Sequence, residues 1–411
     1  MLSEKTIAIV KSTVPILQEH GETLTRHFYT RIFNHNPEVL PFFNPAHQAA
    51  GLQQRALATA ICAYAANIDN LGVLGSAVEL IAQKHVSLQV KPEHYPIVGE
   101  NLLASICEVL GVDATDDVVV AWGEAYGFLA DILIGREKQI YTEHAGMQGG
   151  WEGFRPFRVA RKETESEVIT SFYLVPDDGG ALPVFKPGQY ITMRVPGPYG
   201  HTTMRNYSLS DKPGQDWLRI SVKKETAQDA CTPEGYVSHM LHATVGVGAV
   251  LEIAPPCGEF FWDAVEQHTR PLVLLAGGVG ITPILSILLS ALEHAPERPV
   301  ILVHGCLNEG VQAFRKTIDA LGATHPNLKT HTRYSDPEKT DVISAGSAST
   351  GFIDIALIES LVPTRDADYY FCGPRPFMVG LYQDLLAWGV PASQLHFEFF
   401  GPRQGLDRET A

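Results

Sequence analysis

The hydrophobic pattern of this 411-residue chain changes twice along its length. From Ser3 to about Tyr141, apolar residues recur at intervals of three and four, which predicts helices throughout. From Phe157 to about Phe261, short β-branched and aromatic runs are separated by turn residues, as in a small antiparallel β-barrel. From Pro271 onward, apolar strands alternate with helical stretches, which favours a parallel sheet. A chain this long exceeds one hydrophobic core, so we expect a multidomain protein.

These patterns set the expected domain boundaries. We predict an all-α domain over residues 1–141, a linker over 142–152, an antiparallel β-barrel domain over 153–265 and an α/β parallel-sheet domain over 266–411. The linker contains the small, flexible stretch Ala145–Gly150. Pro15 lies inside the first helical stretch, where we expect a break or a kink.

Composition excludes several classes of protein. The formal net charge of -15, without a Lys/Arg-rich run, argues against a nucleic-acid partner. The N-terminus lacks a leader pattern, and no stretch approaches about 18 uninterrupted apolar residues, so we expect a cytoplasmic monomer without a transmembrane segment. Six scattered cysteines without a C-x-x-C pair favour reduced thiols: Cys62, Cys107, Cys231, Cys257, Cys306 and Cys372.

Two helical stretches carry residues that suit a haem pocket. His85 shares an apolar face with Val78, Ile81 and Leu88. An earlier stretch, with Gln53 at its edge, is predicted to present an inner face of Leu52, Ala56, Leu57, Ala60, Ile61 and Tyr64. Imidazole is a good axial ligand for haem iron, and a Gln amide and a Tyr hydroxyl opposite it would stabilise bound dioxygen. Taken alone, a His on an apolar face is more often a core residue.

The order of the candidate residues adds weight to this interpretation. Tyr29, Phe43 after a proline-broken corner, Gln53 and His85 follow one another at the separations seen in globins. From Leu2 to about Tyr141 the chain resembles a bacterial globin. The resemblance implies that His85 is the proximal iron ligand, that Phe43 packs on the porphyrin, and that Tyr29, Gln53 and Leu57 line the distal side.

The last helical stretch places a carboxylate on an apolar stripe, which consists of Trp122, Tyr126, Leu129, Leu133, Glu137 and Ile140. A buried carboxylate needs partners, and Tyr95 and the free ring nitrogen of His85 are candidates. The alternative is that the helix frays and Glu137 meets water. The patterns Lys91–Tyr95 and Arg136–Glu137 resemble those of flavohaemoglobins, which implies that Tyr95 and Glu137 complete a proximal network that favours redox chemistry.

The barrel segment carries a flavin motif. Pro187–Tyr190 followed by Arg205–Ser208 resembles the FAD-binding barrel of ferredoxin-reductase-like enzymes. An Arg fork suits a pyrophosphate, and an aromatic ring stacks on a flavin. The resemblance implies that Arg205, Asn206, Tyr207 and Ser208 bind FAD, with Tyr190 near its adenine side. It also implies that Val237 and Ser238, in Gly235–His239, contact the flavin phosphates at a helix start.

The last segment carries a dinucleotide motif. Leu272–Pro283 is predicted as a buried strand, a glycine turn and a helix start, so the backbone of this turn would approach a pyrophosphate. Pro283 replaces the third Gly of G-x-G-x-x-G, a shorter form that the reductase family uses. The resemblance implies that the dinucleotide is bound by Gly278, Val279, Gly280, Ile281, Thr282 and Pro283. It implies that the nicotinamide side is lined by Cys372, Gly373 and Pro374. It also implies that the flavin is covered by Phe399, Phe400, Gly401 and Pro402. Flavohaemoglobin tails often carry Cys where Phe399 stands.

The choice between NADH and NADPH is weakly encoded. Glu309 follows the second strand of the α/β segment, where an NADPH site would favour cations. The acidic residue favours NADH, but Arg315 and Arg333 could lie nearby, so NADPH stays open.

The resemblance to flavohaemoglobins covers nearly the whole chain. It implies haem b, FAD and NADH or NADPH as cofactors, and O2, NO and NAD(P)H as partners. The implied activity is that of a nitric oxide dioxygenase, which oxidises NO with O2 to nitrate in nitrosative-stress detoxification. Two alternatives stay open: a haem gas sensor or oxygen carrier that its reductase keeps ferrous, and an NAD(P)H-driven hydroperoxide or ferric reductase.

Overall fold

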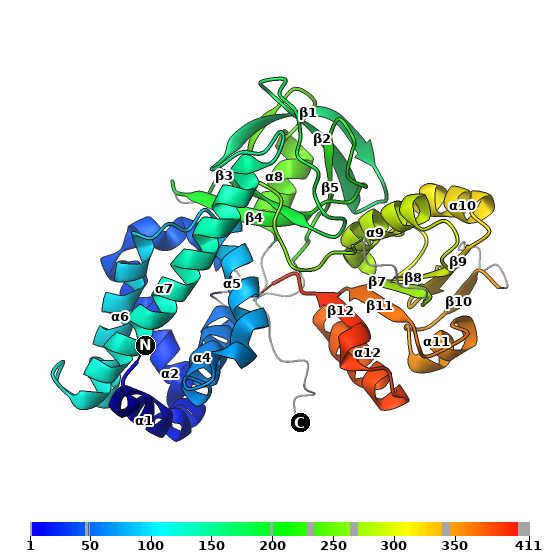
Figure 1. Cartoon of the computed structure of the whole chain (residues 1–411). Helices are drawn as coiled ribbons and strands as arrows, with labels where there is room; N and C mark the ends of the chain where they lie inside the picture. Colours follow the sequence, from blue (N-terminus) through cyan, green and yellow to red (C-terminus); the bar gives the residue numbers. More distant parts are fainter. Residues whose placement is uncertain are drawn as a thin grey trace. The chain divides into compact units, whose positions relative to one another are not determined.

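The computed structural model describes residues 2–45, 48, 50–197, 200–227, 234–263, 270–338 and 346–401 (Figure 1). The chain divides into two compact units. The first, the helical unit, contains Met1–Phe154 and Thr192–Arg205, and the second, the sheet unit, contains Arg155–Ile191 and Asn206–Phe400. The domain boundaries given above remain predictions.

The N-terminal segment is helical, as predicted (Figure 1). Its elements are α1 (Glu4–Ser12), α2 (Val14–His35), η1 (Pro37–Phe42), α4 (Leu52–Ala66), η2 (Leu71–Leu74), α5 (Gly75–Ser87), α6 (His94–Leu110) and α7 (Asp117–Gly146). The break expected at Pro15 is present, because α1 ends at Ser12 and Pro15 lies in the first turn of α2. Proline fits there because the first turn of a helix needs no backbone donor.

The helix α7 runs further than its apolar stripe suggested. It continues past Tyr141 to Gly146, so Ala145 and Gly146 are helical and not part of an irregular linker. The extra turns are held because Ile140 and His144 are buried and the Tyr141 hydroxyl donates to the Val90 carbonyl (2.7 Å).

By length and composition alone, α7 is apolar enough to cross a membrane. One such helix is weak evidence, since the core helix of a globular domain passes the same test. The helix packs against α1, α5 and α6.

The middle segment forms an antiparallel sheet, as predicted. Its strands are β1 (Arg155–Thr164), β2 (Ile169–Pro176), β3 (Tyr190–Pro196), β4 (Thr202–Ser208), β5 (Leu218–Lys223) and β6 (Val250–Ile253), in the order β4-β3-β6-β1-β2-β5. The helix α8 (Tyr236–Thr244) precedes β6. An antiparallel bridge from Leu209 to Ile220 joins the two edges of this sheet, and such closure makes a barrel.

The C-terminal segment forms a second six-stranded sheet in which every pair of neighbours is parallel. Its elements are β7 (Leu272–Gly277), η3 (Gly278–Gly280), α9 (Ile281–His294), β8 (Val300–Cys306), α10 (Arg315–Thr324), β9 (Leu328–Tyr334), β10 (Ala348–Thr350), α11 (Ile355–Leu361), β11 (Asp368–Cys372), α12 (Arg375–Trp388), η4 (Ala392–Gln394) and β12 (Leu395–Glu398). The order β10-β9-β8-β7-β11-β12 reverses direction between β7 and β11. In such sheets, ligands bind at the carboxyl ends of the strands beside this reversal.

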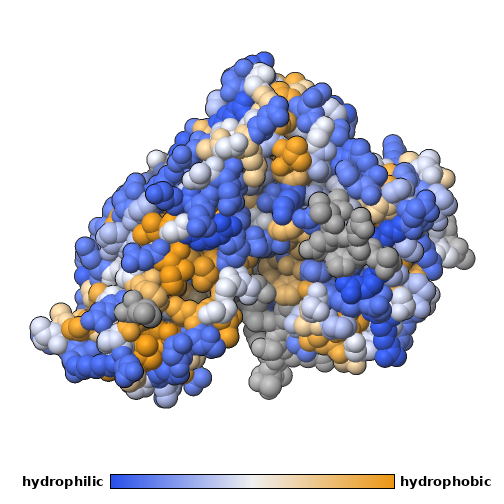
Figure 2. All heavy atoms as spheres, in the orientation of Figure 1, coloured by the Kyte–Doolittle hydropathy of each residue, from blue (hydrophilic) through white to orange (hydrophobic). Residues whose placement is uncertain are grey.

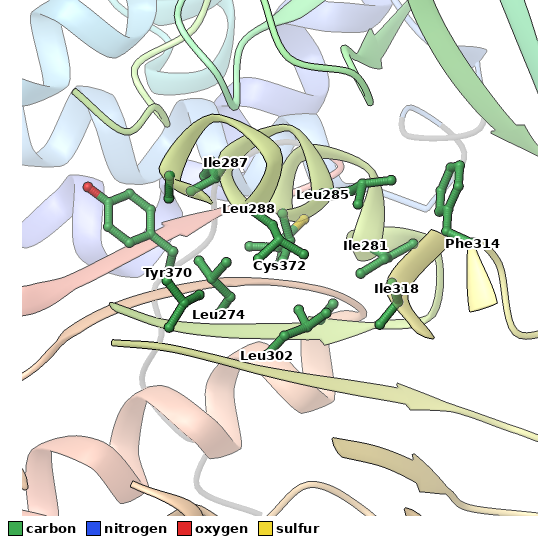
Figure 3. Close-up of a cluster of buried hydrophobic side chains, with 14 of the residues drawn as sticks. Leu274, Ile281, Leu285, Ile287, Leu288, Leu302, Phe314, Ile318, Tyr370 and Cys372 are labelled. Carbon is green, nitrogen blue, oxygen red and sulfur yellow. The ribbon is translucent and has the colours of Figure 1, made fainter. Parts of the chain in front are cut away.

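Helices cover both faces of the parallel sheet. Alternate residues of β7 point to opposite sides: Leu272 and Leu274 join a core cluster with α9, and Val273 and Leu275 join one with α11 and α12. Figure 3 shows the first cluster, where α9 side chains such as Leu288 lie over the strands.

The same cluster includes side chains from the barrel segment and its connection, namely Ile169, Phe260 and Trp262. The Ser286 hydroxyl of α9 donates to the Asp211 carbonyl (2.7 Å), so polar contacts supplement this shared core. The part of the barrel that belongs to the sheet unit therefore packs with the parallel sheet in one shared core.

Candidate functional site

The helical unit brings together a histidine, a carboxylate and a tyrosine from three helices. His85 of α5 donates from Nδ1 to Glu137 Oε1 of α7 at 2.8 Å, and the Tyr95 hydroxyl of α6 donates to the same oxygen at 2.5 Å. His85 Nδ1 also lies 3.1 Å from the Tyr95 hydroxyl oxygen. The Glu137 side chain is 3% exposed, which rules out the alternative that a frayed helix leaves it in water.

This network orients the His85 ring. Burial, followed by the hydrogen bond to Glu137, raises the pKa of Tyr95 far above its ordinary value, so its hydroxyl remains a donor. With the proton on Nδ1 held by a carboxylate, the lone pair of the neutral imidazole is on Nε2. His85 Nε2 accepts no hydrogen bond from the part of the chain that the structure describes. An axial histidine ligand of haem iron has this arrangement.

A second group of predicted residues lies around Tyr29. The Tyr29 ring of α2 meets the Phe43 ring edge-on, with centroids 5.6 Å apart, and Phe43 meets Phe33 in the same way at 5.1 Å. Tyr29 is 8% exposed, and burial raises its pKa. Within the described ranges its hydroxyl makes no hydrogen bond, so a buried donor is left for a ligand.

Gln53 lies at the start of α4, where Gln48 donates to its side-chain oxygen (2.6 Å). The amide of Gln53 is therefore left to donate, as the distal interpretation requires. The neighbouring Gln54 is the more buried of the two, and its amide donates to the Gln48 carbonyl and side-chain oxygens.

The predicted inner face of α4 is partly wrong. Tyr64 is buried and its hydroxyl donates to the Ala125 carbonyl, but Ala60 is exposed. The helix α2 instead meets α4 at Gln54, whose backbone carbonyl accepts from Thr25 Oγ1 (2.9 Å), and at Ala58, whose Cβ lies against Gly21. Leu52, Ala56, Leu57 and Ile61 are only partly buried.

The residues present fit a haem group. Leu57 and Ile61 of α4 and Ile81 of α5 leave apolar surface partly uncovered, which is costly unless an apolar group covers it. Figure 2 shows hydrophobic side chains gathered on the helical unit where α4, α5 and α7 lie in this view. With Nε2 of His85 and the Tyr29 hydroxyl available, the donor set suits an iron porphyrin and a small polar ligand.

The flavin motif lies on β4 and at the start of α8. Arg205, Asn206, Tyr207 and Ser208 are consecutive in β4, where the guanidinium of Arg205 donates to Thr203 Oγ1 (2.8 Å) and the Met204 carbonyl (2.7 Å). The first three are partly exposed, and the alternation of a strand points neighbours to opposite faces. Their contacts with FAD stay a prediction.

Two glycines shape the surroundings of the remaining flavin candidates. Gly258, with φ of 120°, lies against the ring of Tyr190, where a Cβ would be 2.9 Å from the ring. At α8, Gly235 lies so close to Ser238 that a Cβ would be 2.6 Å from its hydroxyl oxygen. Ser238 donates to the Gly235 carbonyl, and Val237 is buried, so this helix start offers mainly backbone amides to an anion.

The glycine turn after β7 is built by close backbone contact with the end of β11. A Cβ on Gly280 would lie 2.1 Å from the Cys372 carbonyl oxygen, and one on Gly277 would lie 2.9 Å from Pro374. Gly278 adopts φ of 55° and faces open space. The predicted residues 278–283 and 372–374 therefore meet at the reversal in strand order, where a dinucleotide would bind.

Side chains in this region do less than the motif suggested. Ile281, Pro283 and Cys372 are buried, and Thr282 donates to the Val279 carbonyl (3.0 Å). Burial raises the pKa of the Cys372 thiol. Backbone groups, with the partly exposed Val279, are thus what this turn can present to a ligand.

The aromatic tail follows β12. Phe399 packs edge-on against Phe397, with centroids 5.8 Å apart, Phe400 is 46% exposed, and Gly401 is partly buried. Pro402 and Cys231 lie outside the described residues. The other five cysteines have free thiols, as expected.

Sequence reasoning missed His304. This residue is 2% exposed on β8, beside Ala276, and its Nε2 donates to the Gly278 carbonyl at 3.1 Å. Its Nδ1 is buried and has no hydrogen-bond partner among the described residues, and burial lowers the pKa of His304 to about 4. No local pattern could reveal this contact, because the register of two parallel strands creates it.

Glu309 and Arg315 form an ion pair beside the carboxyl end of β8, and Arg315 also lies 3.8 Å from Asp319. The second arginine, Arg333, donates to Ser349 (2.8 Å) and lies 3.8 Å from Asp354. Acidic residues therefore accompany both arginines that could bind an extra phosphate.

A cavity of about 230 Å³ lies at the opposite, amino-terminal edge of the parallel sheet. Arg270, Arg298 and Asp368 line this cavity. Both arginines form ion pairs with Asp368, at 2.9 Å for Arg270. Dinucleotides bind at the carboxyl edge of such sheets, so this cavity is not the nucleotide site.

Comparison with known families agrees with a helical domain that suits haem and with a parallel-sheet domain that suits a dinucleotide. Residues 26–133 match the globin family, and residues 274–383 match the oxidoreductase NAD-binding domain family. The flavohemoprotein of Rhodopirellula baltica is 50% identical over 406 residues, which cover 99% of both chains. That of Halalkalibacterium halodurans is 48% identical and covers 98% of this chain and 97% of its own.

Solved structures agree with the fold. The flavohemoglobin of Malassezia yamatoensis, with bound FAD and heme, matches with a TM-score of 0.83 and 25% identity over 97% of this chain and 100% of its own. The FAD/NAD-binding domain of nitric oxide dioxygenase from Vibrio cholerae matches with a TM-score of 0.54 and 35% identity over 60% of this chain and 99% of its own.

Proposed function

The chain belongs to the flavohemoprotein family and is an NAD(P)H-dependent flavohaem oxidoreductase with globin and FAD/NAD reductase domains. From this membership, we propose that it is a nitric oxide dioxygenase. The observation that carries the proposal is the His85–Glu137–Tyr95 network in the same chain as a reductase. A carboxylate behind an iron-bound histidine favours electron transfer and turnover over reversible oxygen storage.

When bound, haem supplies the iron at which dioxygen and nitric oxide combine to nitrate, and FAD and NAD(P)H supply the electrons. His85 would hold the iron through Nε2, and Glu137 keeps the imidazole oriented by accepting a hydrogen bond from Nδ1. Tyr29 and Gln53 donate hydrogen bonds to the negative charge that develops on the oxygen substrate. The Tyr29 hydroxyl keeps its proton, since burial raises its pKa.

In the sheet unit, Gly278 and Gly280 open the turn so that backbone amides at the start of α9 bind the dinucleotide pyrophosphate. From β4, Arg205 would bind the flavin pyrophosphate as a forked donor, and Tyr207 would stack on the flavin ring. The two units thus divide the work: one takes electrons from NAD(P)H, and the other uses them on a gas.

The substitution Tyr29→Phe tests this division. It removes the buried donor and keeps the ring, so we expect NO turnover under saturating NADH to fall on the order of 100-fold. NADH-driven reduction of FAD should not change. The matched control is Tyr64→Phe, which removes another buried hydroxyl of the same unit, bonded to the Ala125 carbonyl; it should cost stability of about 1 kcal/mol and leave turnover intact.

The wild-type protein provides the first measurement. Anaerobic NADH is added, then oxygen, then NO, while the visible spectrum is recorded. Flavin bleaching followed by rapid, catalytic NO loss supports the dioxygenase. A protein with a stable oxygenated spectrum that barely consumes NO would be a gas sensor or an oxygen carrier. Turnover with a hydroperoxide or a ferric chelate, but not with NO, would indicate a hydroperoxide or ferric reductase.

A further inference from the structure

A second bridge joins the helices that carry the histidine and its carboxylate partner. Arg136 of α7 donates to Glu79 of α5 through two parallel bonds, Nε to Oε2 at 2.6 Å and Nη2 to Oε1 at 2.9 Å. The side chains are 28% and 24% exposed, so the pair lies at the edge of the packed interface between the two helices. Arg136 directly precedes Glu137 in the chain.

Other polar groups hold both members of this bridge. Gln83 donates to Glu79 Oε1 at 3.0 Å. The third guanidinium nitrogen of Arg136 donates to Gln139 at 3.2 Å and to Glu143 at 3.3 Å. The Glu79 carboxylate thus accepts three hydrogen bonds and the Arg136 guanidinium makes four, which leaves little freedom to either group.

The bridge is electrostatically well matched. The hydrogen bond from Arg136 holds the pKa of Glu79 below its ordinary value, and the hydrogen bond that Arg136 donates to Glu79 raises the pKa of Arg136. Two parallel donors need the planar fork of a guanidinium, and a lysine could supply only one point contact. The geometry therefore restrains the angle as well as the distance between α5 and α7.

We propose that Arg136 is a positioning residue for the proximal iron ligand. With Glu79 it locks α5 against α7, and this lock keeps His85 Nδ1 at 2.8 Å from Glu137 Oε1. Arg136 touches neither His85 nor any reacting atom; it acts through the two helices. The proposal rests on the haem site of the proposed function and is independent of which gas is the substrate.

The mechanism has a consequence that a purely structural ion pair would lack. Loss of the lock lets the Nδ1–Oε1 contact lengthen, so the imidazole loses part of its anionic character and donates less to iron. The iron–histidine bond weakens, and haem is held less tightly. A structural ion pair would affect only the stability of the fold.

The test uses the full-length ferrous protein and the variants Arg136→Gln, Arg136→Lys and Glu79→Gln. We expect resonance Raman spectroscopy to show the iron–histidine stretch at lower frequency in Arg136→Gln and Glu79→Gln, with a smaller shift in Arg136→Lys. The double variant should shift no further than either single one. The rate of haem loss to excess apomyoglobin should rise about tenfold.

The matched control is Arg31→Gln. Arg31, which is 25% exposed, pairs with Glu108, which is 46% exposed, at 2.6 Å between α2 and α6. Neither helix carries His85 or Glu137, and Glu108 lies at the opposite end of α6 from Tyr95. This variant should change neither the stretch nor haem loss. The proposal is overturned if the Arg136 and Glu79 variants lose stability as Arg31→Gln does but keep the wild-type stretch and haem-loss rate.

Failure of the proposed function gives a different result. If wild-type protein shows the stretch but does not turn over NO, the dioxygenase assignment fails, while the expected frequency shifts still support the lock. If wild-type protein shows no iron–histidine stretch, or if His85→Ala retains it, His85 is not the ligand and the lock proposal falls with it.

Discussion

The helical unit and the sheet unit build their candidate sites from different material. In the helical unit, side chains from three helices converge: His85, Tyr95 and Glu137. In the sheet unit, the dinucleotide turn packs backbone against backbone at Gly280, and the side chains of Ile281, Pro283 and Cys372 are buried. The first kind of site changes its chemistry when one side chain changes. The backbone-built site keeps its chemistry unless a substitution adds a side chain at a glycine whose surroundings leave no room for a Cβ.

The largest effect on the backbone-built site is expected from Gly280→Ala. The new Cβ would lie 2.1 Å from the Cys372 carbonyl oxygen, so the turn and the end of β11 must move apart. We expect destabilisation of about 3 kcal/mol around the turn and near-complete loss of NADH-driven flavin reduction. Stopped-flow reduction and the haem spectrum measure the two units separately, and the haem spectrum should not change.

Gly278→Ala is the paired control. Its Cβ would meet nothing within 4 Å, so only the backbone strain at φ of 55° opposes it, on the order of 1 kcal/mol. Equal loss in both variants would mean that glycine flexibility, and not the backbone contact at Gly280, matters in this turn.

A smaller effect should come from the pH dependence of His304. The unfolded imidazole binds a proton below about pH 6.5, whereas the buried one binds it only below about pH 4. Between these values the unfolded state holds more protons, so the free energy of unfolding falls as the pH falls from 6.5 to 4, by about 3 kcal/mol, and is level above 6.5.

His304→Gln sharpens this prediction because glutamine keeps a donor for the Gly278 carbonyl and does not titrate. Urea unfolding from pH 4.5 to 7.5 should show a shallower loss of stability in the variant than in the wild type, with similar values at pH 7.5. Other histidines whose pKa is lowered by burial, such as His242 and His331, are common to both proteins and cancel in the difference. Parallel curves for the two proteins would show that His304 is not the titrating group.

The smallest effect concerns cofactor choice. Glu309→Gln frees the Arg315 guanidinium, which could then bind the extra phosphate of NADPH. We expect the ratio of kcat/KM for NADPH to that for NADH to rise about tenfold. Asp319→Asn, which removes the more distant partner of Arg315 at 3.8 Å, should change the ratio less. An unchanged ratio in Glu309→Gln would place the discriminating residues elsewhere.

The sequence predicted most of the fold because periodicity reports burial locally. The helical, antiparallel and parallel segments, the break at Pro15 and the strand β7 all follow from such patterns. The short strands β6, β10 and β12 carry no such signal, since three or four residues are too few to show a period.

The candidate site was only partly predictable. The apolar stripe of α7 singled out Glu137, and motifs singled out the glycine turn, because both signals lie within one short segment. The contacts that give these residues their properties span long separations: His85 meets Glu137 across 52 residues, and Arg136 meets Glu79 across 57. The register of β7 and β8 pairs His304 with Ala276, which brings its ring within hydrogen-bond distance of the Gly278 carbonyl. Packing between helices buries Gln54 more than Gln53. A local pattern determines which face an element buries, but only the packing of distant elements decides which side chains meet there.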